Sequence, residues 1–310
     1  MLKYIINRLL QLIPTVLGVV SLVFLFIHIV PGDPIDILLG DQALQTDREA
    51  MRETLGLNLP LGTQYVNFLT GLMHLDLGTS FTYNTPVLET ILNRVPATFI
   101  LAIVAIAIAF ASALVLGIWA AYHEDKWQDR LALAYSSLLF SVPSFWAGPL
   151  LMIVFCLWLG WLPVGGYDSP ASIILPAFTL SMAMSAMTAR LVRMSVLENV
   201  RHDYMRTALA KGLSKRRAFV FHALKNAMLP VITVVFLQAG VLLTGAILVE
   251  AVFSWPGIGT LLMEALNSRD YPMVQGCILF ISMVYMLMTL ISDILYAFLD
   301  PRIRVGGVKR

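Results

Sequence analysis

Charged residues are scarce in this chain. Asp, Glu, Lys and Arg make up only 13% of its 310 residues, against about 25% in an ordinary soluble domain. The shortfall is concentrated in uncharged runs, several of which reach the roughly 20 residues that a helix needs to cross a bilayer. The composition therefore excludes a soluble globular protein and predicts one that crosses the membrane several times.

Cysteine pairs and the usual signatures of catalysis are also missing. The two cysteines, Cys156 and Cys277, lie inside apolar runs, which favours packing over a disulfide framework. No G-x-x-x-x-G-K-[ST] phosphate cradle occurs, the five histidines lack metal-ligand spacing, and no nucleophile, base and orienting partner can be assembled. We expect a chain that is not itself an enzyme, does not hydrolyse ATP and binds no metal or cofactor.

Six apolar runs are present, and each must form a helix because hydrocarbon leaves no other partner for its backbone. They are Leu9–Val30, Thr98–Ala121, Leu131 to about Leu159, Ser172–Ala189, Ala227–Val249 and Met273–Ser292. The first is too long for a signal peptide, and Pro31-Gly32-Asp33-Pro34 follows it instead of a cleavage pattern. The only ionisable groups near the spans are His28, Glu250 and Asp293, each beside a predicted end, which argues against a proton-coupled carrier.

The distribution of Lys and Arg predicts the orientation. Seventeen of the 21 lie in the N-terminal segment, the 122–130 loop, the 190–225 loop and the tail, whereas the remaining four are Arg48, Arg52, Arg94 and Arg269. Because positive loops stay in the cytoplasm, both termini are expected there. Topology explains these charges, so no nucleic-acid partner is expected.

The only sizeable extracytoplasmic segment is 31–97, between the first two spans. The spacing of Thr46 and Glu49 is typical of a capping box, and Gly56 follows where a helix would stop. Gln64–Met73 predicts a second short helix, and Thr85-Pro86 the start of a third. A helical cap on the outer face is expected, because about 65 residues are many for a structureless connector.

The third run contains Pro143 and Pro149, with Ser141 and Ser144 among the hydroxyls nearby. Proline frees backbone carbonyls, and hydroxyl groups can satisfy them. One interpretation is a kinked helix that lines a polar path. The other is ordinary helix packing through small residues.

The loop between the fourth and fifth runs contains a short amphipathic segment beside Gly212. Small residues next to a glycine, on a short helix, suit docking into a groove on another protein. The residues that we expect to transmit force to a motor subunit are Asp203, Tyr204, Arg206, Thr207, Ala208, Lys211, Gly212 and Leu213. Gly212 either permits a tight turn between two helices or simply ends one.

Several motifs occur in a characteristic order along the whole chain. They are Arg8-Leu9-Leu10, Pro31-Gly32-Asp33-Pro34, Leu55-Gly56-Leu57, Asp76-Leu77-Gly78, Asp203-Tyr204 to Gly212, Glu250 to Gly259, Arg269-Asp270-Tyr271-Pro272 and Asp300-Pro301-Arg302. With them the chain resembles a permease subunit of binding-protein-dependent ABC importers, the B-type subunit of the dipeptide, oligopeptide, nickel and glutathione systems. It departs from the general permease pattern, because Arg206-Thr207-Ala208 replaces the acidic start and Lys225 replaces a proline.

The resemblance implies an all-α membrane protein of the type I importer fold, in the inner membrane of a bacterium. It implies residues 1–30 as the first span, 98–299 as a permease core with coupling loop 190–226, and 300–310 as a tail. It also implies a second, C-type permease, two ATPase subunits that carry ATP and Mg, an external binding protein and surrounding membrane lipid. Di- or oligopeptides head the expected substrates, with glutathione and chelated nickel close behind.

The motif after the fifth run is short and aromatic, and its Pro-Gly pair predicts a turn at the outer face. Together with Ser141 and Ser144, we expect the pathway or outer gate to include Glu250, Phe253, Trp255, Pro256 and Gly257. The alternative for Trp255 is an anchor in the membrane interface. The alternatives for the whole chain are an ion-coupled secondary carrier, which inverted repeats would favour, and a passive channel.

Overall fold

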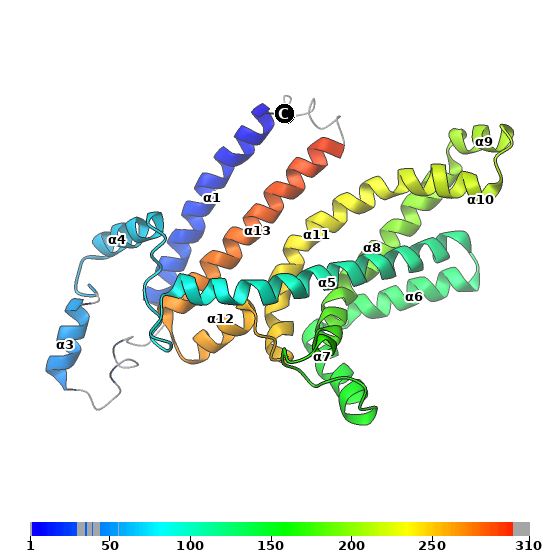
Figure 1. The fold of residues 1–310 in the computed structure, drawn as a ribbon. Coiled ribbons are helices and arrows are strands. Elements are labelled where there is room, and N and C mark those ends of the chain that lie inside the picture. The colour runs from blue at the N-terminus through cyan, green and yellow to red at the C-terminus, as the bar shows by residue number, and fades with distance from the viewer. Residues whose placement is uncertain (1, 30–34, 36–38, 40–43, 55, 300–310) are drawn as a thin grey trace.

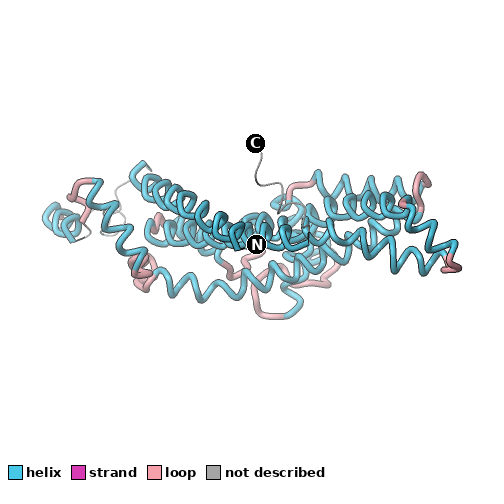
Figure 2. Tube along the Cα trace, turned by 90° about the horizontal axis from the view of Figure 1, so that it is seen from above, coloured by secondary structure: helices cyan, strands magenta, loops and turns pink. Residues whose placement is uncertain are grey.

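The computed structural model describes residues 2–29, 35, 39, 44–54 and 56–299, and nearly all of them are helical (Figure 1). The helices are α1 Leu2–Ile29, α3 Gln45–Thr54, α4 Leu61–Met73, α5 Val87–Tyr122, α6 Trp127–Ser141, α7 Ser144–Met152, η1 Ile153–Trp158, η2 Pro170–Ile173, α8 Ile174–Arg201, α9 Asp203–Ala210, α10 Lys215–Ala218, η3 Phe219–Leu224, α11 Lys225–Val252, α12 Ile258–Asn267 and α13 Tyr271–Leu299. Figure 2 shows them as a flat, elongated assembly joined by loops. In these residues extended pairing is limited to one bridge, Thr79 with Pro86.

The predicted all-α membrane architecture is confirmed. Five segments of the described chain are long and apolar enough to cross a membrane: Ile5–Phe26, Val87–Tyr122, Pro170–Arg201, Lys215–Leu243 and Tyr271–Ile294. Helix α6 and the α7–η1 segment are bent relative to one another by 101°, and they make a sixth span when the bent pair is counted as one. The bend lies at Val142-Pro143, as expected of one of the two prolines, whereas Pro149 lies inside α7.

The helices extend well beyond the predicted runs. The second spanning helix begins at Val87, directly after Pro86, so the third outer helix expected at Thr85-Pro86 is the first part of α5. The fourth spanning helix, α8, continues to Arg201, beyond the predicted end of its apolar run at Ala189. The motif Pro31-Gly32-Asp33-Pro34 and the tail 300–310 lie outside the described residues.

Small residues bring α5 and α8 together. Ala102, Ala105, Ala109 and Ala113 form a fully or almost fully buried stripe on α5 at helical spacing. The stripe ends at Gly117, where an added Cβ would lie 2.6 Å from the carbonyl oxygen of Ala189 and the Cβ of Val192. Helices in membranes associate through such close backbone approach because hydrocarbon supplies no hydrophobic drive between them.

Gly117→Leu is therefore expected to destabilise the chain by about 3 kcal/mol, because the side chain would push α5 away from α8. The measurement is the yield and thermal stability of monodisperse protein extracted in mild detergent. Gly18→Leu in α1 is the matched control, since nothing lies within 4 Å of its added Cβ. Equal stability of the two variants would contradict this account of the α5–α8 interface.

The outer helices α3 and α4 differ slightly from expectation. Because α3 begins at Gln45, Thr46 lies inside it and does not cap it. Gly56 does follow the end of α3, with φ +67° and the N–H of the next residue bonded to the Arg52 carbonyl. The hydroxyls of Tyr65 on α4 and Ser21 on α1 are 2.7 Å apart, so α4 packs along the first spanning helix.

The first and last helices lie side by side, and the start of α1 is near the end of α13 (Figure 1). The guanidinium of Arg8 is 3.3 Å from the carboxylate of Asp293. Both ends of the described chain therefore lie on one side of the bundle, as an even number of spans requires. Asp293, expected beside a span end, forms an ion pair that joins two spanning helices.

Candidate functional site

The segment between α8 and α11 projects from one end of the bundle as a compact helical hairpin (Figure 1). The helix α9 stops at Gly212, whose φ is +88°. The Gly212 N–H donates to the Leu209 carbonyl (3.0 Å) and the Leu213 N–H to the Ala208 carbonyl (3.2 Å), which is a Schellman motif. Nothing lies within 4 Å of an added Cβ at Gly212, so the residue both ends α9 and turns the chain, without any steric contact of its own.

One face of α9 is buried and the other is exposed. Met205 and Ala208 are buried and pack against Ala218 and Ala223 beneath them. Ala208, which we expected to contact a motor subunit, is thus inaccessible to one and holds the hairpin together. The exposed face carries three of the other predicted residues, Asp203, Arg206 and Thr207. Ala210, which was not predicted, is exposed on the same face.

Hydrogen bonds fasten this hairpin to the spanning helices. The Tyr204 hydroxyl donates to the Asn199 side-chain oxygen at 2.7 Å, near the end of α8. One turn earlier, the Ser195 hydroxyl donates to the Ala227 carbonyl of α11 at 2.9 Å. A displacement of α9 would therefore reach both α8 and α11 through Tyr204 and the buried base of the hairpin.

Two ion pairs near this end were missed in the sequence. The Arg193 guanidinium of α8 donates to both carboxylate oxygens of Asp129 on α6, at 2.6 and 2.5 Å, and the Asp129 side chain is only 4% exposed. Arg201 donates to Glu124 at 2.5 Å, but its side chain is 71% exposed. The count of Lys and Arg that predicted the orientation used only the sign of these charges. The partners lie 64 and 77 residues apart in the sequence, and only helix packing brings them together.

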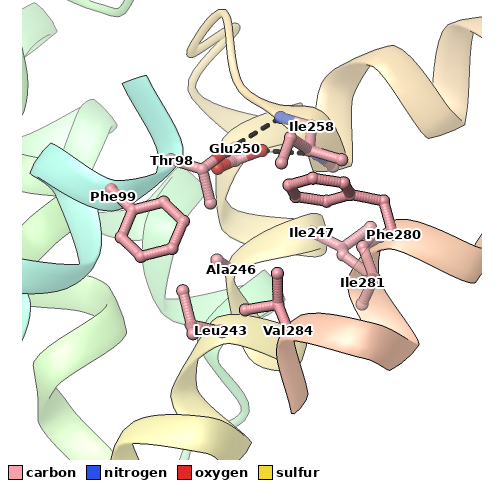
Figure 3. Close-up of a pocket in the computed structure, with 11 residues that line it drawn as sticks. Thr98, Phe99, Leu243, Ala246, Ile247, Glu250, Ile258, Phe280, Ile281 and Val284 are labelled. Carbon is pink, nitrogen blue, oxygen red and sulfur yellow. Dashed lines mark hydrogen bonds between the residues drawn. The ribbon is translucent and has the colours of Figure 1, made fainter. Parts of the chain in front are cut away.

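The outer segment after α11 is folded tightly around Glu250. This side chain is fully buried, and its Oε2 accepts the Gly259 N–H at 2.7 Å, while Oε1 has no hydrogen-bond partner among the described residues (Figure 3). A Cβ at Gly257 would overlap the carboxylate, and one at Gly259 would overlap Ile247, so both positions require glycine for space. Glu250 was expected beside interfacial water, but the chain itself encloses it.

A small cavity of about 20 Å³ adjoins Glu250, large enough for one water molecule. Phe99, Ala246 and Phe280 are among its apolar walls (Figure 3). Thr98, at the same site, accepts the Ile258 N–H on its hydroxyl at 2.9 Å. The first half of α5, the end of α11 and the start of α12 thus meet at one polar point in an apolar surrounding.

The aromatic residues of the segment are buried as well. Trp255 is 2% exposed, and its indole N–H donates to the Ala97 carbonyl at 2.9 Å, so it is no interfacial anchor in this chain. Tyr167 packs edge-on against it, with ring centroids 4.8 Å apart. The Gly166 N–H donates to the Phe253 carbonyl at 3.0 Å, which joins the 159–169 loop to the segment.

Ser141 and Ser144 flank the bend between α6 and α7. Ser141 is exposed and donates to the Ser137 carbonyl at 2.8 Å, one turn earlier in α6, and not to the Leu139 carbonyl that Pro143 leaves free. Further along α7, Gly148 approaches Phe253, whose ring lies 3.1 Å from an added Cβ. The structure therefore brings α7, and not the two serines themselves, against the outer segment.

A third buried carboxylate is that of Asp270, to which sequence analysis gave no role beyond its place in a motif. It is fully buried and accepts hydrogen bonds from the Ser80 hydroxyl, the Thr82 N–H and the Met273 N–H. Nearby, the Tyr83 hydroxyl donates to Glu264 at 2.9 Å, and burial, together with this carboxylate, raises the pKa of Tyr83. Asp270 thus joins the loop before α5 to the start of α13.

The described residues hold no group of three His, Cys, Asp or Glu side chains that could bind a metal ion. The buried carboxylates are instead engaged with backbone N–H groups, hydroxyls or arginine. Their arrangement can hold helices together and can change between bonded and broken states, but it offers no reacting centre.

Comparison with known proteins covers the whole chain. Residues 113–305 match the family described as the binding-protein-dependent transport system inner membrane component, and residues 1–102 match the N-terminal part of such membrane components. The glutathione transport system permease protein GsiC of Salmonella typhimurium is 43% identical over 304 residues, which cover 98% of this chain and 99% of the relative. The proteins of the same name from Pectobacterium atrosepticum and Escherichia coli K12 have the same identity and coverage.

A solved structure has a similar fold. It is described as the crystal structure of an amino acid ABC transporter with histidines, and the similarity has a TM-score of 0.53. It covers 69% of this chain and 94% of the other, at 16% sequence identity, so it concerns the fold alone.

Proposed function

Because the chain belongs to the family of binding-protein-dependent transport system inner membrane components, and is thus the permease of an ABC importer, we propose that it imports glutathione or short peptides like it. The observation that carries this substrate class is the 43% identity to glutathione permeases along nearly their entire length. Longer peptides and chelated nickel remain alternatives within the family. The relatives named above are glutathione permeases, which places glutathione first.

The proposed importer contains this chain, a second permease of the C-type, two ATPase subunits with ATP and Mg, and an external binding protein. The termini and the α9 hairpin face the cytoplasm in this proposal. The excess of Lys and Arg in the connected loops supports that orientation. Affinity purification of the tagged chain from its native membrane tests the composition, and recovery of the chain alone, still able to transport without ATP, would contradict it.

In this proposal α9 transmits the state of the ATPases to the pathway. Its exposed face, with Asp203, Thr207 and Ala210, docks on an ATPase, while Met205 and Ala208 fix it to the hairpin. Nucleotide shifts the equilibrium because it binds better to one of two global states. Tyr204, through Asn199, passes the movement of the hairpin to α8.

The segment from Glu250 to Gly259 is the outer gate in the same proposal. Its bonds to Ala97, Thr98 and Gly166 join α5, α11, α12 and the 159–169 loop at one point. These bonds keep α5, α11 and α12 together at this point in one state, and they must rearrange if the helices separate. The pathway itself lies between this chain and its partner permease, whose surface completes it.

Gly212→Val tests the coupling. We expect uptake to fall at least tenfold, because a β-branched side chain disfavours φ +88° and alters the turn on which α9 is mounted. Uptake of labelled glutathione into proteoliposomes that contain the assembled importer and binding protein is the measurement. Unlabelled dipeptides and nickel chelates added as competitors rank the alternative substrates.

Gly78→Val is the matched control, since Gly78 has φ +80°, has nothing within 4 Å of an added Cβ, and lies near the outer end of α5. Both variants carry a similar backbone strain, but only one carries it in the hairpin. We expect the control to insert and to transport nearly normally. Normal uptake by the Gly212 variant would refute the coupling role without affecting the substrate proposal.

A further inference from the structure

A groove of about 800 Å³ lies beside the α9 hairpin, between the ends of α5 and α8 and the start of η3. Its walls are apolar and include Tyr122, Val200, Leu209 and Val220, all of which are exposed. Leu209 belongs to the flank of α9 and not to the face centred on Thr207 that we assign to the ATPase. The groove therefore adjoins that docking face, and the exposed side chain of Arg206 lies between the two.

Basic residues surround these walls. Arg206, Lys215 and Arg216 line the groove, and all three are exposed. The one acid in the lining, Glu124, accepts a hydrogen bond from Arg201 at 2.5 Å and is thereby compensated. Asp203 lies 3.7 Å from Arg206, but both side chains are almost fully exposed, and such pairs contribute little. The groove thus has net positive charge above an apolar floor.

Aromatic residues indicate where the groove lies relative to the bilayer. Trp119, Tyr122 and Trp127 are exposed around the connection between α5 and α6, which forms one edge of the groove. Tryptophan and tyrosine gather where lipid headgroups meet the hydrocarbon. Exposed rings of this kind beside the groove favour a position close to the lipid headgroups.

We propose that this groove is a binding site for an acidic phospholipid. The phosphate lies against Lys215 and Arg216, with Arg206 beside them, and the first part of the acyl chains lies along Tyr122 and Val220. Basic pockets between spanning helices recognise anionic headgroups in this way. A lipid held here contacts the hairpin and α5 together, so its presence would bias the hairpin's position. The lipid proposal depends only on insertion of the chain into a membrane. If the lipid does not bind, the proposed importer role is unaffected.

The test compares two double variants of the purified importer in detergent. Lys215→Gln/Arg216→Gln removes two charges from the groove, and Arg217→Gln/Lys225→Gln removes two from exposed neighbouring positions that do not line it. Binding of phosphatidylglycerol and phosphatidylcholine is titrated and followed by native mass spectrometry. We expect phosphatidylglycerol to bind the groove variant about 30-fold more weakly, about fivefold for each charge, and the control like the original chain.

Three outcomes would overturn the proposal. One is equal affinity of both double variants for phosphatidylglycerol, and another is equal affinity of the original chain for the zwitterionic lipid. The third comes from a Val220→Cys variant in native membranes: cross-linking of this cysteine to an ATPase subunit would show that protein fills the groove. Size-exclusion chromatography of each variant establishes that the importer is intact, so a loss of binding cannot reflect misfolding.

Discussion

Arg193→Leu is expected to destabilise the chain by about 3 to 5 kcal/mol, the usual cost of leaving one charge of a buried pair without its partner. The carboxylate of Asp129 would remain with a single backbone donor, the Asp125 N–H at 3.1 Å, in a site that is 4% exposed. Because this pair joins α6 to α8, the defect should appear as loss of folded protein. Thermal stability and monodisperse yield in mild detergent are the measurements.

The same helix offers the matched control. Arg201 also pairs with an acid, but its side chain is 71% exposed, and exposed pairs contribute about 0 to 1 kcal/mol. Arg201→Leu should therefore leave stability nearly unchanged. Replacing both Arg193 and Asp129 by leucine should recover most of the loss, since apolar pairs often substitute well for buried ion pairs. Equal losses for the Arg193 and Arg201 variants would contradict the assignment of burial as the cause.

Gly257→Leu is expected to abolish transport and to destabilise the chain by more than about 3 kcal/mol. Even the first carbon of the side chain would overlap the carboxylate of Glu250, which bonds to Gly259 and cannot withdraw into solvent. The segment from Phe253 to Gly259 would lose its contacts with Ala97 and Thr98. Uptake by the reconstituted importer and the thermal stability of the purified chain measure the two effects.

A compensating pair distinguishes this overlap from a general intolerance of the outer segment. Gly257→Ala alone should be strongly impaired, whereas Gly257→Ala combined with Glu250→Ala should be more stable than the single variant, because the clashing group is gone. The double variant still loses the bond to Gly259, so full transport is not expected. If the double variant is less stable than Gly257→Ala, the two residues do not clash and the structural explanation is wrong.

The two expected effects concern opposite ends of the bundle. The Asp129–Arg193 pair lies toward the α9 hairpin, and the Glu250 network lies at the outer end of α11. Between them, α8 and α11 pack along their length and share the bond from Ser195 to Ala227. A change at the hairpin thus has a continuous, well-packed route to the outer segment, which is what the proposed coupling of nucleotide state to the outer gate needs.

Much of this protein could be predicted from its sequence alone, because the membrane simplifies the problem. A bilayer demands long apolar runs that close their own backbone hydrogen bonds, so composition and length predict helices and their approximate positions. The bend at Pro143, the helix stops at Gly56 and Gly212, and the family resemblance follow from local backbone chemistry or from motif order. The basic loop between the fourth and fifth spans also has a clear signal, since nine of its residues are Lys or Arg.

Only the tertiary structure shows which side chains are buried and what each one touches. Sequence reasoning made Ala208 a contact residue and Trp255 a possible interfacial anchor, and packing buries both. It missed the roles of Asp129 and Asp270, whose hydrogen-bond partners lie 64 and 190 residues away. The sequence does not show whether a carboxylate is hydrated or bonded to such a distant partner. The physical reason is that helix packing, and not local propensity, determines these partners. The sequence therefore determined the helices and the family, while the packing decided how the hairpin and the outer segment are held.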